Sequence, residues 1–452
     1  MLLYLALGGL AFLTCPRTLV LVGFIMSRHH ETGLRRKDKH PIVYLDYAAT
    51  TPADQSVVDI ITQHLGFEGV FGNPSSRSHQ FGRIAEEAVE TARSHLAELI
   101  SADSAEIVWT SGATESINLA IKGVVCGRSQ QGVHIVTSSL EHKAVLDSCA
   151  YLESKGFEIT YVTPDQEGII TPEKVDEALR DDTVLVSLVH VNNEVGTITD
   201  INTIGQIIRD RGIPFHVDAA QSSARLPINV NKIPVDFISL SGHKMYGPKG
   251  VGALYIRKRS GISIKPQTHG GGQESGIRPG TLPTHQLVGM GEAARLAKQR
   301  LHQDAKTIAA LDKYLLDSLA DIESARLNGN QAHRVPGILN ISFAHVENES
   351  LMMSLEDVAI SPGSACTSSR IEPSHVLLEL GVSEDAANCS VRFSIGRQTT
   401  RDEIGFAAMR VKKSVELLRE LSSQRRSSNS DKQFQSRNKT KSNITVTRGN
   451  IV

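Results

Sequence analysis

Residues 214–250 read PFHVDAAQSSARLPINVNKIPVDFISLSGHKMYGPKG, and this stretch decides the fold class. It holds two short apolar runs, Pro214–Asp218 and Phe237–Leu240, each followed by polar and small residues. Such runs are typical of buried strands that end in turns. Runs of the same kind occur elsewhere in the chain, at Glu106–Thr110, Val133–Thr137, Val184–Val189 and Ala253–Ile256.

Amphipathic stretches alternate with these runs and predict helices at Ile84–Ile100, Thr114–Val125, Lys143–Lys155, Pro172–Arg180 and Ile201–Asp210. The alternation predicts an α/β fold with a mainly parallel sheet and helices on both faces. A long helical pattern at Thr284–Ala320 leads into a second, smaller α/β segment. We therefore predict a large domain over residues 55–300 and a small C-terminal domain over residues 301–421.

The composition excludes several classes of protein. The 452 residues are 40% hydrophobic and 21% charged, so global disorder and low complexity are excluded. Both ends of the chain are basic, and residues 422–452, for example, hold seven Lys and Arg residues but only one acidic residue, Asp431. Because the whole chain has a net charge of −1, its middle part must be acidic. That distribution argues against a nucleic-acid-binding surface. Five cysteines in so long a chain favour a reducing, intracellular location.

The two ends differ from the body of the chain. Residues 1–41 begin with apolar stretches interrupted by Pro16 and Arg17 and then become basic. They are open to three interpretations: a membrane anchor, a targeting leader, or a segment not translated before Met26, which we favour. The stretch 422–452 is rich in Ser, Asn, Gln, Lys and Arg, and its composition predicts a basic, disordered tail.

Three elements of the body carry chemistry. Lys244 lies in a Gly-rich turn after an apolar strand, where its pKa can fall as a Schiff-base lysine requires. Asp218 ends the strand Pro214–Asp218, where a buried carboxylate needs a cationic partner such as a pyridinium nitrogen. The stretch Trp109–Asn118 (WTSGATESIN) combines a strand, a small-residue turn and a helix start, which can hold a phosphate.

Each of these elements also has an ordinary interpretation. A lysine in such a turn is more often a solvated surface residue, Asp218 before two alanines suits a helix N-cap, and many helices begin as the one after Trp109 does. Taken together, however, the three elements provide an imine lysine, a ring-nitrogen acid and a phosphate cradle. This combination predicts a pyridoxal 5′-phosphate site.

The sequence resembles the fold-type I pyridoxal-phosphate enzymes, and specifically the cysteine desulfurases of the iron–sulfur-cluster assembly type. The similarity runs from about Tyr44 to about Leu421. Matching motifs are YLDYAATTP from Tyr44, Phe71–His79, Thr110–Gly123, Glu141–Leu146, His190–Gly196, Ser241–Gly252, His269–Gly272, Gly280–Gln286 and Ser361–Ser368. The resemblance implies a seven-stranded, mainly parallel sheet in the large domain and an N-terminal segment, residues 42–54, that packs with the small domain.

The resemblance also implies cofactor contacts. Lys244 would bind the cofactor covalently, Asp218 would pair with the pyridine nitrogen, and His142 would stack on the ring and assist proton transfer. Gln221 would reach the ring oxygen, and Thr281 would reach the phosphate of a neighbouring subunit, which implies a homodimer. The complete implied set of cofactor-binding residues is Ala113, Thr114, His142, Asn193, Asp218, Gln221, Ser241, His243, Lys244 and Thr281.

The implied substrate is L-cysteine. Arg392 would bind its carboxylate, assisted by Asn73 and Asn193. The nucleophile would be Cys366 in SPGSACTS, a small, polar stretch that predicts a mobile, exposed loop, whereas Cys126, Cys149 and Cys389 suit inert core positions.

The Cys366 thiolate would take the substrate sulfur as a persulfide and leave alanine. The implied acceptors are an iron–sulfur scaffold protein and sulfur relay proteins for tRNA thiolation, and Cys366 would also be a transient iron–sulfur ligand. We expect a cytoplasmic location, with the mitochondrial matrix as the alternative.

This sequence departs from the family pattern at Pro279, Pro362 and Arg370, and most of all in its basic C-terminal tail, which leaves scaffold docking open. Two alternatives to a desulfurase remain. One is another fold-type I enzyme, such as a selenocysteine lyase, a kynureninase or an aminotransferase. The other is a non-catalytic subunit that keeps the fold. Cys366 in its long, small-residue loop favours the desulfurase over the other enzymes. The joint presence of Lys244, Asp218, His142, Cys366 and Arg392 argues against a non-catalytic subunit.

Overall fold

The computed structural model describes residues 42–128, 132–362 and 373–441, with side chains described as far as Ser423. The chain divides into two units, residues 1–43 and 44–452, and the first lies almost wholly outside the described residues. The leader predicted for residues 1–41 and the segment that holds Cys366 also lie outside them. The described elements therefore belong almost entirely to the unit from Tyr44 onward.

A seven-stranded sheet forms the centre of this unit, with the strand order β2-β8-β7-β6-β5-β3-β4. Its strands are β2 (Ile107–Thr110), β3 (His134–Ser138), β4 (Glu158–Val162), β5 (Thr183–Val189), β6 (Phe215–Asp218), β7 (Phe237–Ser241) and β8 (Gly252–Ile256). Every pairing from β4 through β7 is parallel, and β8 alone runs antiparallel to its two neighbours. The mainly parallel, seven-stranded sheet is thus confirmed.

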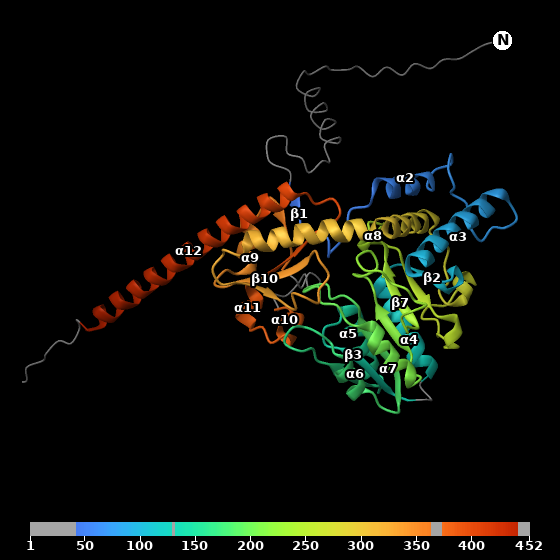
Figure 1. Cartoon of the computed structure of the whole chain (residues 1–452), viewed down its shortest axis with the longest axis horizontal. Coiled ribbons are helices and arrows are strands. Elements are labelled where there is room, and N and C mark those ends of the chain that lie inside the picture. The colour runs from blue at the N-terminus through green and yellow to red at the C-terminus, as the bar shows by residue number, and fades with distance from the viewer. Residues whose placement is uncertain (1–41, 129–131, 363–372, 442–452) are drawn as a thin grey trace, which may run out of the picture. The chain divides into compact units, whose positions relative to one another are not determined.

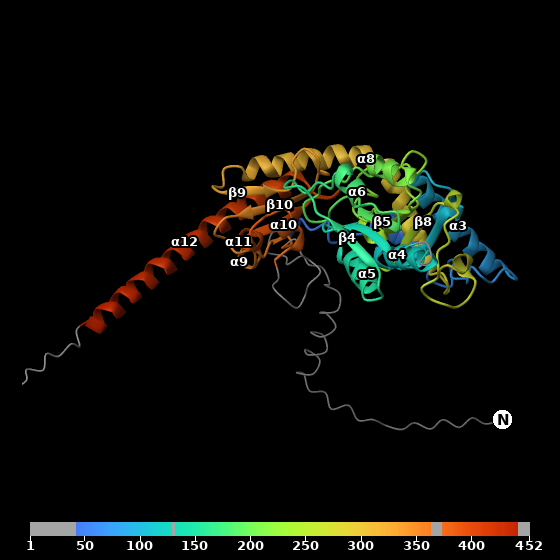
Figure 2. The ribbon, with the colours of Figure 1, turned by 90° about the horizontal axis from the view of Figure 1, so that it is seen from below.

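Helices cover both faces of this sheet (Figures 1 and 2). They are α2 (Gln55–Gln63), α3 (Gln80–Ile100), α4 (Ala113–Arg128), α5 (Lys143–Glu153), α6 (Pro172–Ala178), α7 (Ile201–Asp210) and α8 (Thr284–Leu319). Short 3₁₀ turns η2 (Ser104–Glu106), η3 (Gly242–Lys244), η4 (Lys258–Ser260) and η5 (Gln273–Gly276) lie between these elements. The helices predicted from the sequence are all present, with ends shifted by a few residues.

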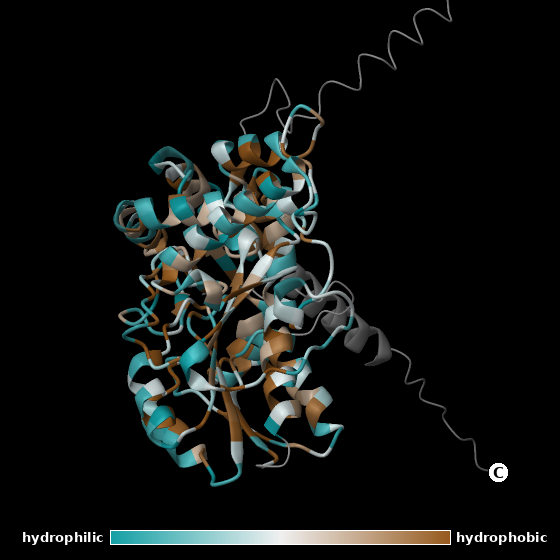
Figure 3. Ribbon diagram, turned by 90° about the vertical axis from the view of Figure 1, so that its right-hand side faces the viewer, coloured by the Kyte–Doolittle hydropathy of each residue, from teal (hydrophilic) through white to brown (hydrophobic). Residues whose placement is uncertain are grey.

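Two apolar clusters explain why the helices pack on opposite faces. One cluster joins α4 and α5 to the sheet through residues such as Ile121, Val145 and Leu254. The other joins α3, α7 and α8 to the opposite face through residues such as Leu96 and Ile204. Figure 3 shows the hydrophobic residues gathered along the strands. Burial on both faces accounts for the near-continuous apolar runs in the sequence.

The C-terminal part forms a smaller sheet with the antiparallel order β12-β10-β9. Its elements are β9 (Ala325–Asn328), β10 (Ile338–Phe343), α9 (Asn348–Ser354), β11 (Val358–Ala359), α10 (His375–Glu379), α11 (Glu384–Asn388), β12 (Ser390–Ser394) and α12 (Arg401–Lys441). The N-terminal strand β1 (Val43–Tyr44) precedes Leu45, whose N–H donates to the carbonyl of Ala359 at 2.9 Å.

The structure corrects the prediction for the C-terminal tail. The composition predicted disorder from Ser422, whereas α12 continues as helix to Lys441, and residues 442–452 lie outside the described residues. The stretch from Ser422 to Lys441 contains neither Gly nor Pro, so nothing in it breaks a helix that has already begun at Arg401. Within the described residues, no helix is both long and apolar enough to cross a membrane.

Candidate active site

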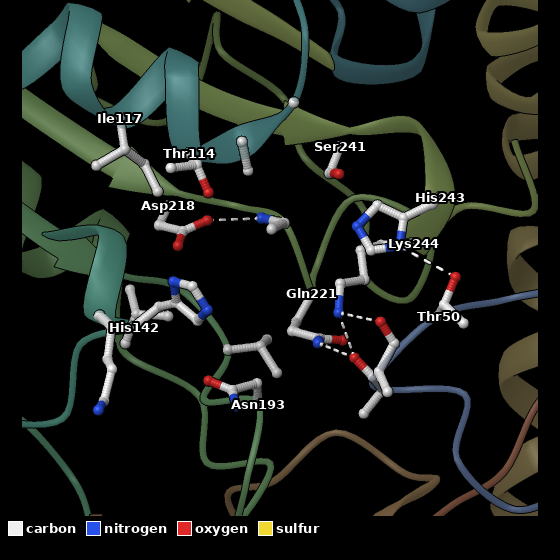
Figure 4. A pocket seen from close by; sticks show the side chains of 18 of the residues that line it. Thr50, Thr114, Ile117, His142, Asn193, Asp218, Gln221, Ser241, His243 and Lys244 are labelled. Carbon is white, nitrogen blue, oxygen red and sulfur yellow. Dashed lines mark hydrogen bonds between the residues drawn. The ribbon is translucent and has the colours of Figure 1, made fainter. Parts of the chain in front are cut away.

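A cavity of about 600 Å³ lies where five parallel strands of the large sheet end. It is lined by residues that directly follow the carboxyl ends of β2, β3, β5, β6 and β7, as expected for a ligand site in a parallel sheet (Figure 4). Ten of the sequence-predicted residues line it: Ala113, Thr114, His142, Asn193, Asp218, Gln221, Ser241, His243, Lys244 and Arg392.

Lys244 enters the cavity from η3, the turn that follows β7. Its ammonium group donates to the backbone carbonyls of Ala48 and of Ala49, the latter at 2.8 Å. The Gln221 amide donates to the same Ala48 carbonyl at 2.8 Å (Figure 4). The segment Ala48–Thr50 therefore forms one wall of the site. Sequence reasoning missed this role because backbone acceptors leave no signature in residue identity.

Asp218, at the end of β6, and His142, just after β3, both face the cavity (Figure 4). The Asp218 side chain is buried, and one carboxylate oxygen accepts the N–H of Ala220 at 2.9 Å. Burial raises the pKa of Asp218, while that N–H and the nearby charges of His142 and Lys244 oppose the shift. His142 is the N-cap residue directly before α5, and its Nδ1 accepts the N–H of Ala144 at 3.1 Å, which fixes the orientation of the ring.

The opposite side of the cavity is suited to an anion. Helix α4 begins at Ala113, so the backbone N–H groups of its first turn point toward the cavity beside Thr114. Ser241 and His243 lie across from that turn (Figure 4). His243 Nδ1 is 3.1 Å from the Thr50 hydroxyl. Burial, together with Lys244 and Lys249, lowers the pKa of His243 to about 4, so its ring is neutral at physiological pH.

Arg392 reaches the cavity from β12 in the smaller sheet. Its side chain is only 1% exposed. The guanidinium donates to the carbonyl of Asn193 and to the carboxylate of Asp46, both at 2.9 Å. Its Nε is buried and has no hydrogen-bond partner among the described residues. A buried guanidinium with an unused donor at a cavity wall is well suited to a carboxylate ligand.

These side chains and backbone groups fit pyridoxal 5′-phosphate. A helix N-terminus with hydroxyl groups suits the phosphate, and a buried carboxylate suits a protonated ring nitrogen. The Lys244 amine is held by two backbone carbonyls within the same cavity. Among the described residues, no group of three or more His, Cys, Asp or Glu side chains could hold a metal ion.

Three predicted residues are not among those that line this cavity. Asn73 and Thr281 are exposed, and Asn73 accepts the N–H of Ser75 at 2.9 Å in a local turn. Cys366 lies outside the described residues. The described segments on either side of it, however, contact the site: Ser361 pairs with the backbone of Arg392, and His375 lines the cavity.

The other cysteines agree only partly with the prediction of inert core positions. Cys149 is buried, and burial raises the pKa of its thiol to about 12. Cys389 is half-buried, and burial raises its pKa as well. Cys126 is exposed near the end of α4, so its predicted core position is wrong. A helical context alone did not reveal which face of α4 it occupies.

The structure adds Glu141 to the lining residues found from sequence. Its Oε1 accepts from the Ser138 hydroxyl at 2.5 Å and from the N–H of Val189 at 2.9 Å, while Oε2 is buried with no partner among the described residues. Burial raises the pKa of Glu141 to about 8. Burial therefore favours the protonated, neutral form of Glu141. In the sequence, the one indication that Glu141 lines the cavity is its position directly before His142.

We expect Gly252→Ala to weaken cofactor binding and lower stability together. A Cβ at Gly252 would lie 2.6 Å from both Gly112 Cα and the Leu240 carbonyl, so the turn before α4 must move. Overpacking of this kind costs roughly 1–3 kcal/mol. Urea denaturation and cofactor titration measure both effects. Gly66→Ala is the control, because a Cβ there has no neighbour within 4 Å. Equal cofactor affinity in both variants would contradict the expectation.

The α/β fold and this set of side chains define a pyridoxal-phosphate-dependent enzyme of the aminotransferase class. Residues 43–406 match the model of the family described as aminotransferase class-V. A cysteine desulfurase IscS of Vibrio vulnificus is 56% identical over 380 residues, which cover 84% of this chain and 94% of that protein. The chain therefore belongs to the class-V aminotransferase family, among its cysteine desulfurases.

Solved structures agree with this assignment. A NifS-like protein superposes with a TM-score of 0.77 at 34% identity, covering 83% of this chain and 99% of that one. A structure of SspA in complex with cysteine superposes with a TM-score of 0.71 at 39% identity, covering 79% of this chain and 100% of that one.

Proposed function

We propose that this protein is a pyridoxal-phosphate-dependent cysteine desulfurase that converts L-cysteine to L-alanine and leaves the sulfur as a persulfide on Cys366. The observation that carries the proposal is the convergence of Lys244, Asp218, His142 and Arg392 on one cavity at the strand ends. An amine, a ring-nitrogen acid, a ring-stacking imidazole and a carboxylate clamp are the groups that this reaction needs.

Each of these residues has a defined task in the proposed reaction. Arg392 binds the substrate carboxylate through its Nε–H, which has no partner among the described residues, and Asn193 lies beside it. Asp218 would hold the ring nitrogen of the cofactor protonated, and His142 would cover the ring, because both side chains line the cavity. Pyridoxal phosphate, when bound, supplies an electron sink for the pair left by loss of the α-proton. The Lys244 amine accepts that proton.

The sulfur-transfer step belongs to Cys366. Its thiolate attacks the substrate sulfur, so that a sulfur–sulfur bond forms while the substrate Cβ–S bond breaks. The electron pair of that bond remains on Cβ, which takes up a proton to give alanine. Atoms and electrons balance without an added reductant, and the sulfur remains on Cys366 as a persulfide.

We also propose that the protein works as a homodimer with shared sites. Asn73 and Thr281 are both exposed and lie outside their own chain's cavity, so a second copy can bring Thr281 to the cofactor phosphate. An exposed aromatic cluster of Phe67, Phe71 and Phe81, with ring centroids 5.3–5.5 Å apart, lies next to Asn73 in sequence. Phe67 is 78% exposed, and burial against a second copy would remove this apolar surface from water.

The proposed sulfur acceptors are an iron–sulfur scaffold protein and sulfur relay proteins, and Cys366 would hold a nascent cluster only transiently. The basic stretch after Ser422 departs from the family pattern. The contact with the scaffold protein would therefore use a different surface or a different geometry. A cytoplasmic location, with the mitochondrial matrix as the alternative, provides the reducing surroundings that a free Cys366 thiol needs.

We expect protein expressed from Met26 to show the visible absorption of bound pyridoxal phosphate and to release alanine from L-cysteine. Mass mapping should find one added sulfur on Cys366. Cys366→Ala should keep the visible absorption and lose the persulfide. Alanine formation should fall by about 10²-fold or more, because the reaction loses its nucleophile.

Cys126→Ala is the matched control, because Cys126 is exposed but lies near the end of α4 rather than beside the cavity. It should retain full activity. Alanine release without a Cys366 adduct would indicate a direct lyase instead. Undiminished sulfur release by Cys366→Ala under limiting reductant would reject Cys366 as the nucleophile.

A further inference from the structure

The short turn η5 has an unfavourable backbone conformation. Glu274 (φ 47°, ψ 45°) and Ser275 (φ 57°, ψ 27°) are both left-handed, and Gly276 follows with φ 77°. Left-handed geometry is unfavourable for residues that carry a side chain. Two such residues in succession persist only where surrounding contacts hold them in place. The turn precedes Thr281 by a few residues in the chain.

The Glu274 carboxylate supplies the holding contacts. It accepts two N–H groups of Arg93 at 2.7 and 2.8 Å and the backbone N–H of Trp109 at 2.7 Å. Arg93 lies on α3 and Trp109 on β2, and Arg93 also donates to the Ile107 carbonyl at 2.8 Å. The side chains of Arg93 and Glu274 are 9% and 3% exposed, respectively. A buried, bidentate ion pair therefore holds the turn against α3, and the N–H of Trp109 holds it against β2.

The same loop is connected to the phosphate side of the cavity. The N–H of Gly280 donates to the Gln273 side chain at 3.0 Å, which closes residues 273–280 into a compact loop. Arg278 donates to Glu115 at 2.8 Å, and Glu115, which lines the cavity, accepts the N–H of Ser111 at 2.6 Å. The loop before Thr281 thus has defined contacts at both of its ends.

We infer that Glu274 is a positioning residue that fixes this loop, so that Thr281 is presented to the cofactor phosphate of a second copy of the chain. The inference rests on the homodimer proposed above. Three donors converge on the carboxylate, and a carboxylate can accept from all of them. A glutamine in this position would direct its own N–H groups at donors, and the strained turn would lose its main anchor.

The test compares two aldehydes that differ only in the phosphate. The full chain is prepared as wild type, Glu274→Gln, Thr281→Ala and the double variant, and its affinities for pyridoxal 5′-phosphate and for pyridoxal are measured by visible titration. We expect Glu274→Gln to weaken the phosphorylated form by about tenfold or more, as the loss of a charge-assisted hydrogen bond predicts. Pyridoxal affinity should stay unchanged. The double variant should be no weaker than Thr281→Ala.

Two further variants separate positioning from general destabilisation. Arg93→Lys keeps the charge but loses the bidentate geometry, and it should reproduce the selective loss. Asp312→Asn breaks the Arg334–Asp312 pair, which is similarly buried at 5% and 8% exposure but does not line the cavity. It should lower the melting temperature and leave the ratio of the two affinities unchanged.

The outcomes distinguish this inference from the proposed function. If Glu274→Gln weakens both aldehydes equally, or adds its full effect to that of Thr281→Ala, the positioning role is overturned while the enzyme assignment stands. If Thr281→Ala has no effect on the phosphorylated form, the shared site and the role of Glu274 both fail. Wild-type protein that binds neither aldehyde would contradict the proposed function and this inference together.

Discussion

We expect Lys244→Ala to abolish the visible band of lysine-bound cofactor and to lower alanine formation from L-cysteine by at least about 10²–10⁴-fold, the usual contribution of a positioned acid–base group. The reason is geometric. Lys244 is one of two lysines on the turn after β7 that line the cavity, and its amine is directed at the carbonyls of Ala48 and Ala49. Absorption spectroscopy of the purified variant and an alanine assay measure both losses.

Lys249 is the matched control, because it also lines the cavity but is exposed and lies five residues further along the chain. Lys249→Ala should keep the visible band. Borohydride, which fixes a lysine-bound aldehyde permanently, should add the cofactor mass to the peptide that contains Lys244 in the wild type. A cofactor mass on Lys249, or a band that survives in Lys244→Ala, would refute the assignment.

The strand ends explain how much of the site was predictable. Asp218 and Ser241 end parallel strands that pair directly, so a sequence pattern of strand followed by polar residue places both at one edge of the sheet. The same logic brings His142 and Thr114 to that edge from β3 and β2. Parallel strands give this information because their carboxyl ends share a side.

Contacts between distant parts of the chain were not predictable in this way. Asp46 pairs with Arg392, which is 346 residues away in the sequence, and Glu274 pairs with Arg93, which is 181 residues away. Neither pair follows from local periodicity, because each forms only when the whole unit packs. The backbone carbonyls of Ala48 and Ala49 leave no trace in residue identity at all. The helical stretch after Ser422 was missed because it has few apolar residues to show a period.

Arg392→Lys should raise the KM for L-cysteine by about 10–100-fold, because a charge-assisted hydrogen bond contributes about 1.5–3 kcal/mol. The lysine keeps one positive charge, but it cannot serve Asp46, the Asn193 carbonyl and a substrate carboxylate with the planar fork of Arg392. The visible band of the cofactor should remain, since Arg392 reaches the cavity from the smaller sheet rather than from the strand ends. Steady-state kinetics with alanine detection measure this effect.

The comparison that isolates the carboxylate uses L-alanine and L-alaninamide as ligands, because the amide is neutral where the acid is charged. Wild-type protein should bind L-alanine more tightly, and Arg392→Lys should remove most of that preference while leaving the amide affinity unchanged. Asp46→Asn is the control, since it removes the ion pair between Asp46 and Arg392, which are 2.9 Å apart, yet keeps the guanidinium of Arg392. If Asp46→Asn lost the preference as completely as Arg392→Lys, the ion pair with Asp46 rather than the Arg392 Nε–H would select the carboxylate. An unchanged preference in Arg392→Lys would instead place the carboxylate elsewhere in the cavity.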